Sequence, residues 1–234
     1  MLDFYFWPTP NGWKVSIMLE ECGLDYNLIP VDIGRGDQFK RDFLAISPNN
    51  RMPAVVDNDV EGGPESVFES GAILYYLAEK TCKFMPSDRR GRKEVLEWLF
   101  WQVGNQGPMA GQLSHFVNYA DGGIEYGKKR YSNEYNRCLG VLEKRLEDRE
   151  YIIGDYSIVD MICWPWVLIA KPLGQSLEEF PNVARWRNAI KLRPAVQRGV
   201  DVGKEFRRSG PPSDEERKVM FNQTAQTADE QSDA

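Results

Sequence analysis

A hydroxyl and a carboxamide, from Thr9 and Asn11, lie in a turn between a short apolar run and a helical pattern. A junction between a strand and a helix directs free backbone amides and the positive end of the helix dipole toward one point. That point favours an anion, such as a thiolate or a carboxylate. The two side chains therefore form a candidate anion site, and a plain helix cap with a proline-fixed turn is the alternative.

A second candidate is the segment 49–52 together with the proline that follows it, Pro53, which opens a predicted strand. A cis peptide bond between Met52 and Pro53 would turn the amide and carbonyl of Met52 outward. A bound peptide could then pair with these groups as an added strand does. An ordinary trans proline at the start of an edge strand is the statistically favoured alternative.

A third candidate is the pair Glu69-Ser70, which directly precedes another helical pattern. Free amides at a helix start favour a carboxylate, and the Glu69 side chain can hold an ammonium group. Together they fit the head of an α-amino acid, which carries both charges. The alternative is that Ser70 serves only as a helix N-cap.

The elements that must position these residues follow from the hydrophobic pattern of the first eighty or so residues. Strand-like and helix-like spacings alternate there and predict the order β-α-β-α-β-β-α. The predicted strands are 2–6, 26–33, 52–56 and 67–68, and the predicted helices lie near 15–22, 39–44 and 70–80. Every long segment beyond residue 91 has helical spacing, so the rest of the folded chain is predicted to be all-helical.

Composition divides the chain into three parts. We expect an α/β domain over 1–84, an all-helical domain over 91–203, and a polar, acidic and mobile tail over 204–234. Within the helical part, Ser157 and Asp160 have the spacing of a capping box.

Charge and cysteine usage exclude several classes of function. A formal net charge of −6 and a pI near 5.1 argue against nucleic acid as a partner. The longest apolar run has eight residues, which is too short to span a bilayer, so no membrane role is expected. The four cysteines are widely separated and have no histidine nearby, which disfavours a metal site and favours a reducing cytoplasm.

The three candidate motifs, in this order and on this pattern, resemble the glutathione transferase superfamily. The first part is similar to its thioredoxin-like domain and the second to its helical domain, over about residues 1–200. More narrowly, the chain resembles the Nu class, bacterial enzymes related to the yeast nitrogen-catabolite prion protein. The motifs that carry this are TPNG at 9–12, SPNNRMP at 47–53, FESGAIL at 68–74 and WLFWQVG at 98–104.

The resemblance implies roles at both ends of a bound glutathione. Thr9 and Asn11 would lie beside its sulfur. Gln38 and Arg51 would lie toward its glycine end. Glutathione itself would be the cosubstrate, and no metal is expected.

The resemblance also implies how the rest of the tripeptide is held. Met52 would pair with the cysteinyl backbone through a cis bond to Pro53. Glu69 and Ser70 would hold the γ-glutamyl head. Arg130 matches an arginine of the helical domain that faces the active site.

The activity that the resemblance implies is a cytoplasmic, homodimeric, glutathione-dependent disulfide oxidoreductase. The reacting thiols would belong to glutathione and to a small disulfide, since the turn 9–11 has no cysteine. Helix amides, with the Thr9 and Asn11 donors, would lower the thiol pKa from about 8.5 toward neutrality. The rate of attack depends on that thiolate fraction.

Two other functions stay open at this stage. The first is glutathione conjugation or peroxide reduction of an electrophile held over the helical domain, where four tryptophans could line a pocket or simply fill a core: Trp98, Trp101, Trp164 and Trp166. The second is a binding or regulatory protein on the same fold. Tyr5 and Ser16, near positions where other classes carry catalytic groups, are interpreted as core and mid-helix residues.

Overall fold

The computed structural model describes residues 1–120, 122 and 124–224. These residues form two compact units. The first contains Met1–Tyr76 and the described residues from Gly199 onward, and the second contains Leu77–Arg198. The three candidate motifs of the first third of the chain therefore all lie in the first unit.

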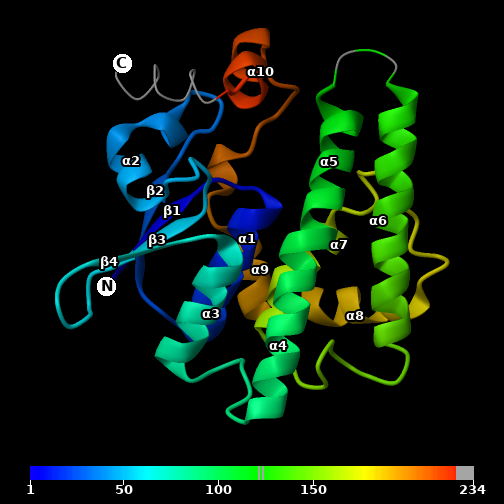
Figure 1. Ribbon diagram of the computed structural model, residues 1–234, viewed down its shortest axis with the longest axis horizontal. Coiled ribbons are helices and arrows are strands. Elements are labelled where there is room, and N and C mark those ends of the chain that lie inside the picture. Colours follow the sequence, from blue (N-terminus) through cyan, green and yellow to red (C-terminus); the bar gives the residue numbers. More distant parts are fainter. Residues whose placement is uncertain (121, 123, 225–234) are drawn as a thin grey trace. The chain divides into compact units, whose positions relative to one another are not determined.

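A four-stranded mixed sheet is the centre of the first unit (Figure 1). Its spatial order is β2-β1-β3-β4, with bounds β1 Leu2–Phe6, β2 Tyr26–Pro30, β3 Ala54–Asp57 and β4 Glu65–Phe68. Strand β1 pairs in parallel with β2 and antiparallel with β3, and β3 pairs antiparallel with β4. This is the thioredoxin-like arrangement that we expected for the first part of the chain.

Helices cover both faces of this sheet because successive side chains of β1 point to opposite faces. Phe4 and Phe6 are fully buried on one face. Tyr5, on the other face, packs against Phe43 with ring centroids 5.9 Å apart. The helices are α1 Pro10–Cys22, α2 Arg41–Ile46 and α3 Ser70–Thr81, with a 3₁₀ turn at Asp37–Phe39. The element order is the predicted one.

Three strands differ from their predicted bounds: β4 begins at Glu65 rather than at residue 67, and the differences in β3 and β2 have identifiable reasons. Strand β3 begins at Ala54 rather than at Met52, because Pro53 has no N–H to donate to the ladder. Strand β2 ends at Pro30 rather than at residue 33. After it, Asp32 forms a turn by accepting the Gly34 amide at 2.9 Å.

The described residues of the second unit form mainly helices, as predicted. They are α4 Arg89–Trp101, α5 Gly107–Asn118, α6 Glu125–Arg145, α7 Ile158–Leu168, α8 Pro181–Lys191 and α9 Pro194–Asp201, the last of which ends in the first unit. A π-helical segment, Gln102–Gln106, joins α4 to α5. Between α6 and α7, two isolated β-bridges are formed by the pairs Tyr151–Gly154 and Ile153–Asp155.

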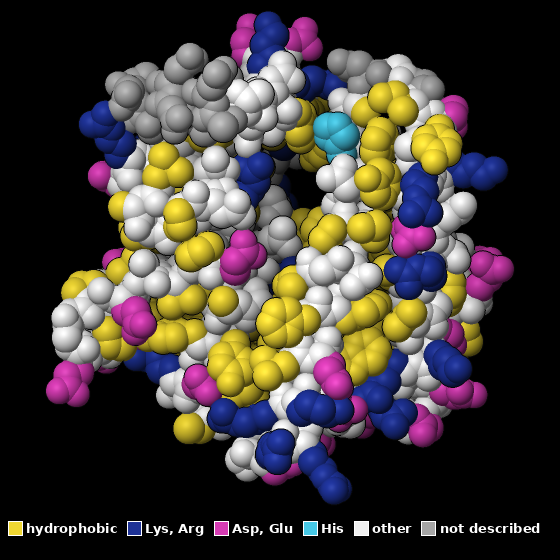
Figure 2. Space-filling model, viewed as in Figure 1, with side chains coloured by type: hydrophobic (Ala, Val, Ile, Leu, Met, Phe, Trp, Pro, Cys, Tyr) yellow, Lys and Arg dark blue, Asp and Glu magenta, His cyan; other side chains and the backbone are white. Residues whose placement is uncertain are grey.

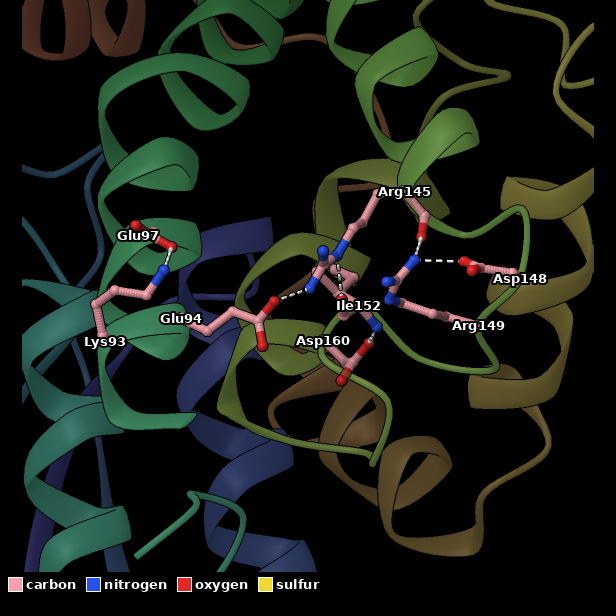
Figure 3. A network of polar contacts seen from close by, with 8 residues as sticks. All are labelled: Lys93, Glu94, Glu97, Arg145, Asp148, Arg149, Ile152 and Asp160. Carbon is pink, nitrogen blue, oxygen red and sulfur yellow. Dashed lines mark hydrogen bonds and ion pairs between the residues drawn. The ribbon is translucent and has the colours of Figure 1, made fainter. Parts of the chain in front are cut away.

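The predicted capping box at the start of α7 is present and fully buried. Asp160 accepts the Ser157 amide at 3.0 Å, the Ile152 amide at 3.0 Å and the Trp186 indole N–H at 2.8 Å. The carbonyl of Ile152 accepts from Arg145 at 2.6 Å, and Arg145 also pairs with Glu94 (Figure 3). One carboxylate and one guanidinium thus fix the same loop residue from its two sides.

The segment 204–224 contains a 3₁₀ turn, Lys204–Phe206, and helix α10, Asp214–Phe221. Ser213 and Glu216 form a capping box that starts α10. The helix is part of the first unit (Figure 1). The remainder of the expected tail, with the acids at 229, 230 and 233, lies outside the described residues.

Candidate functional site

Thr9 is the N-cap of α1. Its φ and ψ of −121° and 164° are extended, its Oγ1 accepts the Gly12 amide at 3.3 Å, and its carbonyl accepts the Trp13 amide at 3.0 Å. The hydroxyl hydrogen points toward a sulfur atom, since Oγ1 donates to Sδ of Met52 at 3.6 Å. The helix cap and a donor directed at sulfur are therefore combined in one side chain.

Gly12 allows the turn to lie this close to the sheet. A Cβ at this position would meet the Trp7 carbonyl oxygen at 2.3 Å and the Phe6 ring at 2.8 Å. Only glycine avoids both contacts. Asn11, one residue earlier and half-buried, lies in the first turn of α1, which begins at Pro10, whereas the sequence placed it in a turn before a helix near 15–22.

The peptide bond between Met52 and Pro53 is cis, as the resemblance implied. The Met52 side chain is buried in a cluster with Val31, Phe43 and Ala54. The preceding loop is held by Ser47, whose hydroxyl donates to the Arg51 carbonyl at 2.8 Å. The loop that contains Met52 is thereby fixed beside the start of α1.

Glu69 and Ser70 stand at the start of α3. Glu69 has a φ of 68°, in the left-handed region that a residue with a side chain adopts rarely, and its carboxylate accepts from Asn49 at 3.2 Å. The Ile73 amide bonds to the Glu69 carbonyl, so Ser70 is the first residue inside the helix rather than its N-cap. Ser70 is 8% exposed.

Lys14 is a functional candidate that we did not predict. It lies on α1, is only 2% exposed, and its ammonium donates to Ser70 Oγ at 3.3 Å. The sequence carried a signal, because Lys14 is four residues before Met18 and thus on the face of α1 that is buried. A lysine at such a position has its amino group inside the protein.

Gln38 and Arg51 differ in their surroundings. Gln38 is 2% exposed, its Nε2 donates to the Ile33 carbonyl at 3.2 Å, and its Oε1 is buried without a partner among the described residues. Arg51 is exposed and donates to Gln223, just beyond α10, at 2.8 Å. A Cβ at Gly36 would lie 3.6 Å from Val219, so α10 packs against the loop before Gln38.

Arg130 belongs to the second unit. It lies exposed on α6 and pairs with Glu134 one turn later at 3.4 Å. The structure brings together Thr9 with Met52, and Glu69 with Ser70, within the first unit.

The protein's own nucleophilic and titratable groups near the turn have structural roles. Ser16 is fully buried and donates to the Gly199 carbonyl at 2.6 Å. Burial raises the pKa of Tyr5, which packs in the cluster around Phe43. Cys22 is a buried thiol at the far end of α1 and is not part of a disulfide. The described residues contain no group of His, Cys, Asp and Glu that could hold a metal ion.

The four tryptophans divide into two pairs. Trp164 and Trp166 are 1% and 7% exposed, which makes them core residues of the helical unit. Trp98 and Trp101 are half-buried and pack edge-on at 5.1 Å. A cavity of about 620 Å³ in this unit is lined by other residues, among them Val167, Ala170 and Arg187.

No helix in the described part of the chain is long and apolar enough to cross a membrane.

Two family models match the sequence. Residues 2–79 match the N-terminal domain of glutathione S-transferase and residues 116–194 match its C-terminal domain. The disulfide-bond oxidoreductase YfcG of Escherichia coli is 51% identical over 199 residues, which covers 84% of this chain and 93% of that protein. The disulfide-bond oxidoreductase YghU of the same species is 40% identical, over 90% and 76% of the two chains.

Solved structures agree with these matches. A glutathione transferase from Burkholderia graminis with two glutathione molecules bound per subunit has a TM-score of 0.80 and 46% identity, covering 87% of this chain and 88% of that one. A glutathione transferase from Pseudomonas putida with one glutathione disulfide bound per subunit has a TM-score of 0.81 and 40% identity, covering 86% and 91%. By fold, domain order and sequence, this chain belongs to the glutathione S-transferase family.

Proposed function

We propose that this protein is a glutathione-dependent disulfide oxidoreductase, in which the N-terminus of α1 stabilises a glutathione thiolate. The observation that carries the proposal is the Thr9 hydroxyl, which caps α1 and donates to the thioether sulfur of Met52, with Oγ1 and Sδ 3.6 Å apart. The two Escherichia coli relatives named disulfide-bond oxidoreductases support the same reaction.

The Thr9 hydroxyl favours a thiolate over its present partner. A thioether sulfur is a weak hydrogen-bond acceptor, whereas a thiolate carries a full charge and forms a stronger, charge-assisted bond. The Gly12 amide fixes the hydroxyl oxygen, so the hydrogen can turn from Met52 to an incoming thiolate without loss of the helix cap. The positive end of α1 favours the same negative charge.

The chemistry then uses thiols that the substrates bring. One glutathione thiolate attacks a sulfur of the substrate disulfide, the S–S bond breaks, and one substrate thiolate leaves and takes up a proton. A second glutathione thiolate attacks the glutathione sulfur of the mixed disulfide, and the second substrate thiol leaves. Two glutathiones have become glutathione disulfide, and their two protons are on the two substrate thiols.

The protein's own cysteines are not needed for these steps. Cys22 is the last residue of α1, about 18 Å along the helix axis from its start at Pro10. Burial and distance both separate its thiol from the turn at Thr9. None of the four cysteines, all within the described residues, forms a disulfide, which also supports a location in the reducing cytoplasm.

We assign the remaining parts of glutathione to the residues that suit their charge. Glu69 and the start of α3 hold the ammonium and carboxylate of the γ-glutamyl head, and Met52 pairs with the cysteinyl backbone. The glycine carboxylate is assigned to Arg51, whose acceptors among the described residues are all neutral: the carbonyl and side chain of Asn50 and the side chain of Gln223. A carboxylate is a stronger acceptor than any of them.

Asn11, Gln38, Pro53 and Arg130 complete the proposed site. Asn11 would donate beside the sulfur, and Pro53 would hold Met52 in its pairing conformation. Gln38 would lie near the glycine end, and Arg130 is assigned on the resemblance of its sequence stretch. The relatives with two glutathiones or one glutathione disulfide per subunit support a site large enough for both tripeptides, and we place the chain in the Nu class on its motifs.

A homodimer is part of the proposal. Helix α4 exposes Leu96 and Phe100 one turn apart, at 39% and 70%, and Val103 follows in the π-helical segment at 38%. Figure 2 shows exposed apolar side chains over α4. We propose that a second copy of the chain covers this apolar face.

Replacement of the Thr9 side chain tests the proposed thiolate site. Thr9→Ala removes the hydroxyl donor, and we expect kcat/KM for a small disulfide to fall about 10-fold to 100-fold, because a positioned donor to a developing or full charge is lost. Thr9→Ser is the control, since it keeps both the donor and the cap. Loss of the cap costs about 1 kcal/mol, so thermal unfolding is measured alongside.

The assay is run with a small disulfide and with an aryl halide side by side. Unchanged disulfide turnover in Thr9→Ala contradicts the assigned role. Turnover of the aryl halide that exceeds that of the disulfide assigns the protein to conjugation instead. If the wild-type protein neither reduces disulfides nor binds immobilised glutathione, it is a binding or regulatory member of the family.

A further inference from the structure

Lys14 places its amino group in the interior of the first unit. Its neighbours on α1, Val15 and Met18, are fully buried, and Lys14 itself is 2% exposed. Lysine is rarely buried to this extent, because its ammonium loses hydration there. A helix that needed only to fill the core would carry an apolar side chain at this position.

The hydrogen bond from Lys14 fixes the direction in which Ser70 can donate. An ammonium group has donors only, so Ser70 Oγ must be the acceptor in the 3.3 Å contact. A serine hydroxyl has a single hydrogen, which is left to bond elsewhere. In the first turn of α3 the nearby backbone groups without intrahelical partners are N–H donors, which cannot accept it.

We propose that Lys14 is a positioning residue of the γ-glutamyl subsite, which locks the Ser70 hydroxyl as a donor to the ligand's α-carboxylate and adds positive charge beneath it. This inference rests on the proposed function, which places that carboxylate at the start of α3. The Ser70 hydroxyl and the first amides of α3 then form one group of donors, and Lys14 lies one hydrogen bond behind them.

The charge of Lys14 would also compensate for a repulsion within the subsite. Glu69 places a carboxylate, held by Asn49 at 3.2 Å, directly before Ser70. That carboxylate suits the ligand's ammonium but repels the ligand's carboxylate. A buried ammonium behind Ser70 offsets the repulsion between Glu69 and the ligand's carboxylate, because the field of a buried charge is screened less than that of a surface charge.

Binding of two ligands to the full-length protein tests the inference. S-methylglutathione carries the α-carboxylate and cannot react as a thiol. Its analogue with γ-aminobutyrate in place of the γ-glutamyl residue lacks only that carboxylate. We expect Lys14→Met to weaken binding of S-methylglutathione at least 10-fold and binding of the analogue less than twofold, as measured by calorimetry.

Three further variants separate positioning from folding. Ser70→Ala should likewise weaken binding of S-methylglutathione more than binding of the analogue. Because Lys14 and Ser70 share one contact, the loss in the double variant should be smaller than the product of the single losses. Val15→Ala, a fully buried neighbour on α1, is the control and should not distinguish the two ligands.

Steady-state kinetics give an independent readout. In Lys14→Met we expect KM for glutathione to rise about 10-fold while kcat changes less than twofold. If Lys14→Met does not fold, Lys14→Gln keeps a polar, uncharged side chain and should lose at least fivefold in affinity for S-methylglutathione alone. Equal losses for both ligands, or no loss, would overturn the inference.

Failure of the proposed function and failure of the Lys14 inference give different results. If the wild-type protein does not bind S-methylglutathione, the glutathione site itself is wrong. If the wild-type protein binds it and Ser70→Ala distinguishes the two ligands while Lys14→Met does not, the site stands and the role of Lys14 falls.

Discussion

The fully buried carboxylate of Asp160 holds the start of α7, and its contribution to the stability of the fold depends on pH. Burial raises the pKa of Asp160 to about 6 from an ordinary value of 3.8, although the amides of Ile152 and Ser157 and the Trp186 indole partly oppose this. Between these values the folded state keeps a proton that the unfolded state releases. The contribution of Asp160 to stability is therefore complete below pH 4 and falls as the pH rises to 6.

Asp160→Asn removes this titration. We expect the free energy of unfolding of the wild-type protein, relative to this variant, to fall by about 3 kcal/mol between pH 4 and pH 6 and then to level off. Urea unfolding at several pH values measures the difference. Asp148→Asn, which changes a 73% exposed carboxylate in the same unit, is the control. A difference that stays constant over this range would show that Asp160 does not titrate there.

At the level of residues, the sequence predicted the groups that belong to motifs and missed those that depend on burial. Thr9 and Ser70 stand at predicted helix starts, so their type and position were enough. Lys14 was missed because lysine is usually exposed, and only its place on the apolar face of α1 indicated otherwise. Gln38 was named through the resemblance, but its burial could not be predicted, because it depends on a loop whose path has no periodic signal.

At the level of elements, helix α10 limits access to Arg51. Glu216 accepts the Ser213 amide at 2.7 Å and pairs with Arg208 at 2.8 Å, which fixes the helix start. Just past its end, Gln223 accepts from Arg51 at 2.8 Å. In the proposed site this contact competes with the glycine carboxylate of glutathione.

Gln223→Ala should therefore improve binding at the glycine end. The exposed hydrogen bond from the Arg51 guanidinium to the Gln223 amide oxygen contributes about 0.5–1 kcal/mol, so we expect KM for glutathione to fall about twofold to fivefold with kcat unchanged. Asn222→Ala, one residue earlier, is the matched control. A KM that stays the same or rises in Gln223→Ala would show that the contact does not restrain Arg51.

The order of the elements could be predicted from hydrophobic spacing alone, because β1, α1 and α3 each have a clear period. Helix α10 was not expected, since its polar composition resembles that of a mobile tail. The spacing of Ser213 and Glu216 was the available signal. The π-helical segment after α4 has no signature that distinguishes it from a regular helix.

At the level of the whole molecule, the apolar face of α4 determines the expected assembly. Phe100→Glu places a charge at the most exposed apolar residue of that face, and a charge buried there without a partner is unfavourable. We expect this variant to shift from dimer to monomer in sedimentation analysis. Arg90→Glu introduces the same residue on another side of α4 and should leave the dimer intact. A monomeric wild-type protein would exclude this interface.

The crowding around Gly12 restricts how a protein-borne nucleophile could ever enter this site. A Cβ there collides with a main-chain oxygen of Trp7 and with the ring of Phe6, so no cysteine can be introduced at residue 12 without rebuilding the end of β1. Evolution or engineering toward a protein-bound mixed disulfide must instead work at residues 9–11. Each of these positions belongs to the cap and first turn of α1, so gaining such a thiol means giving up part of the proposed thiolate site.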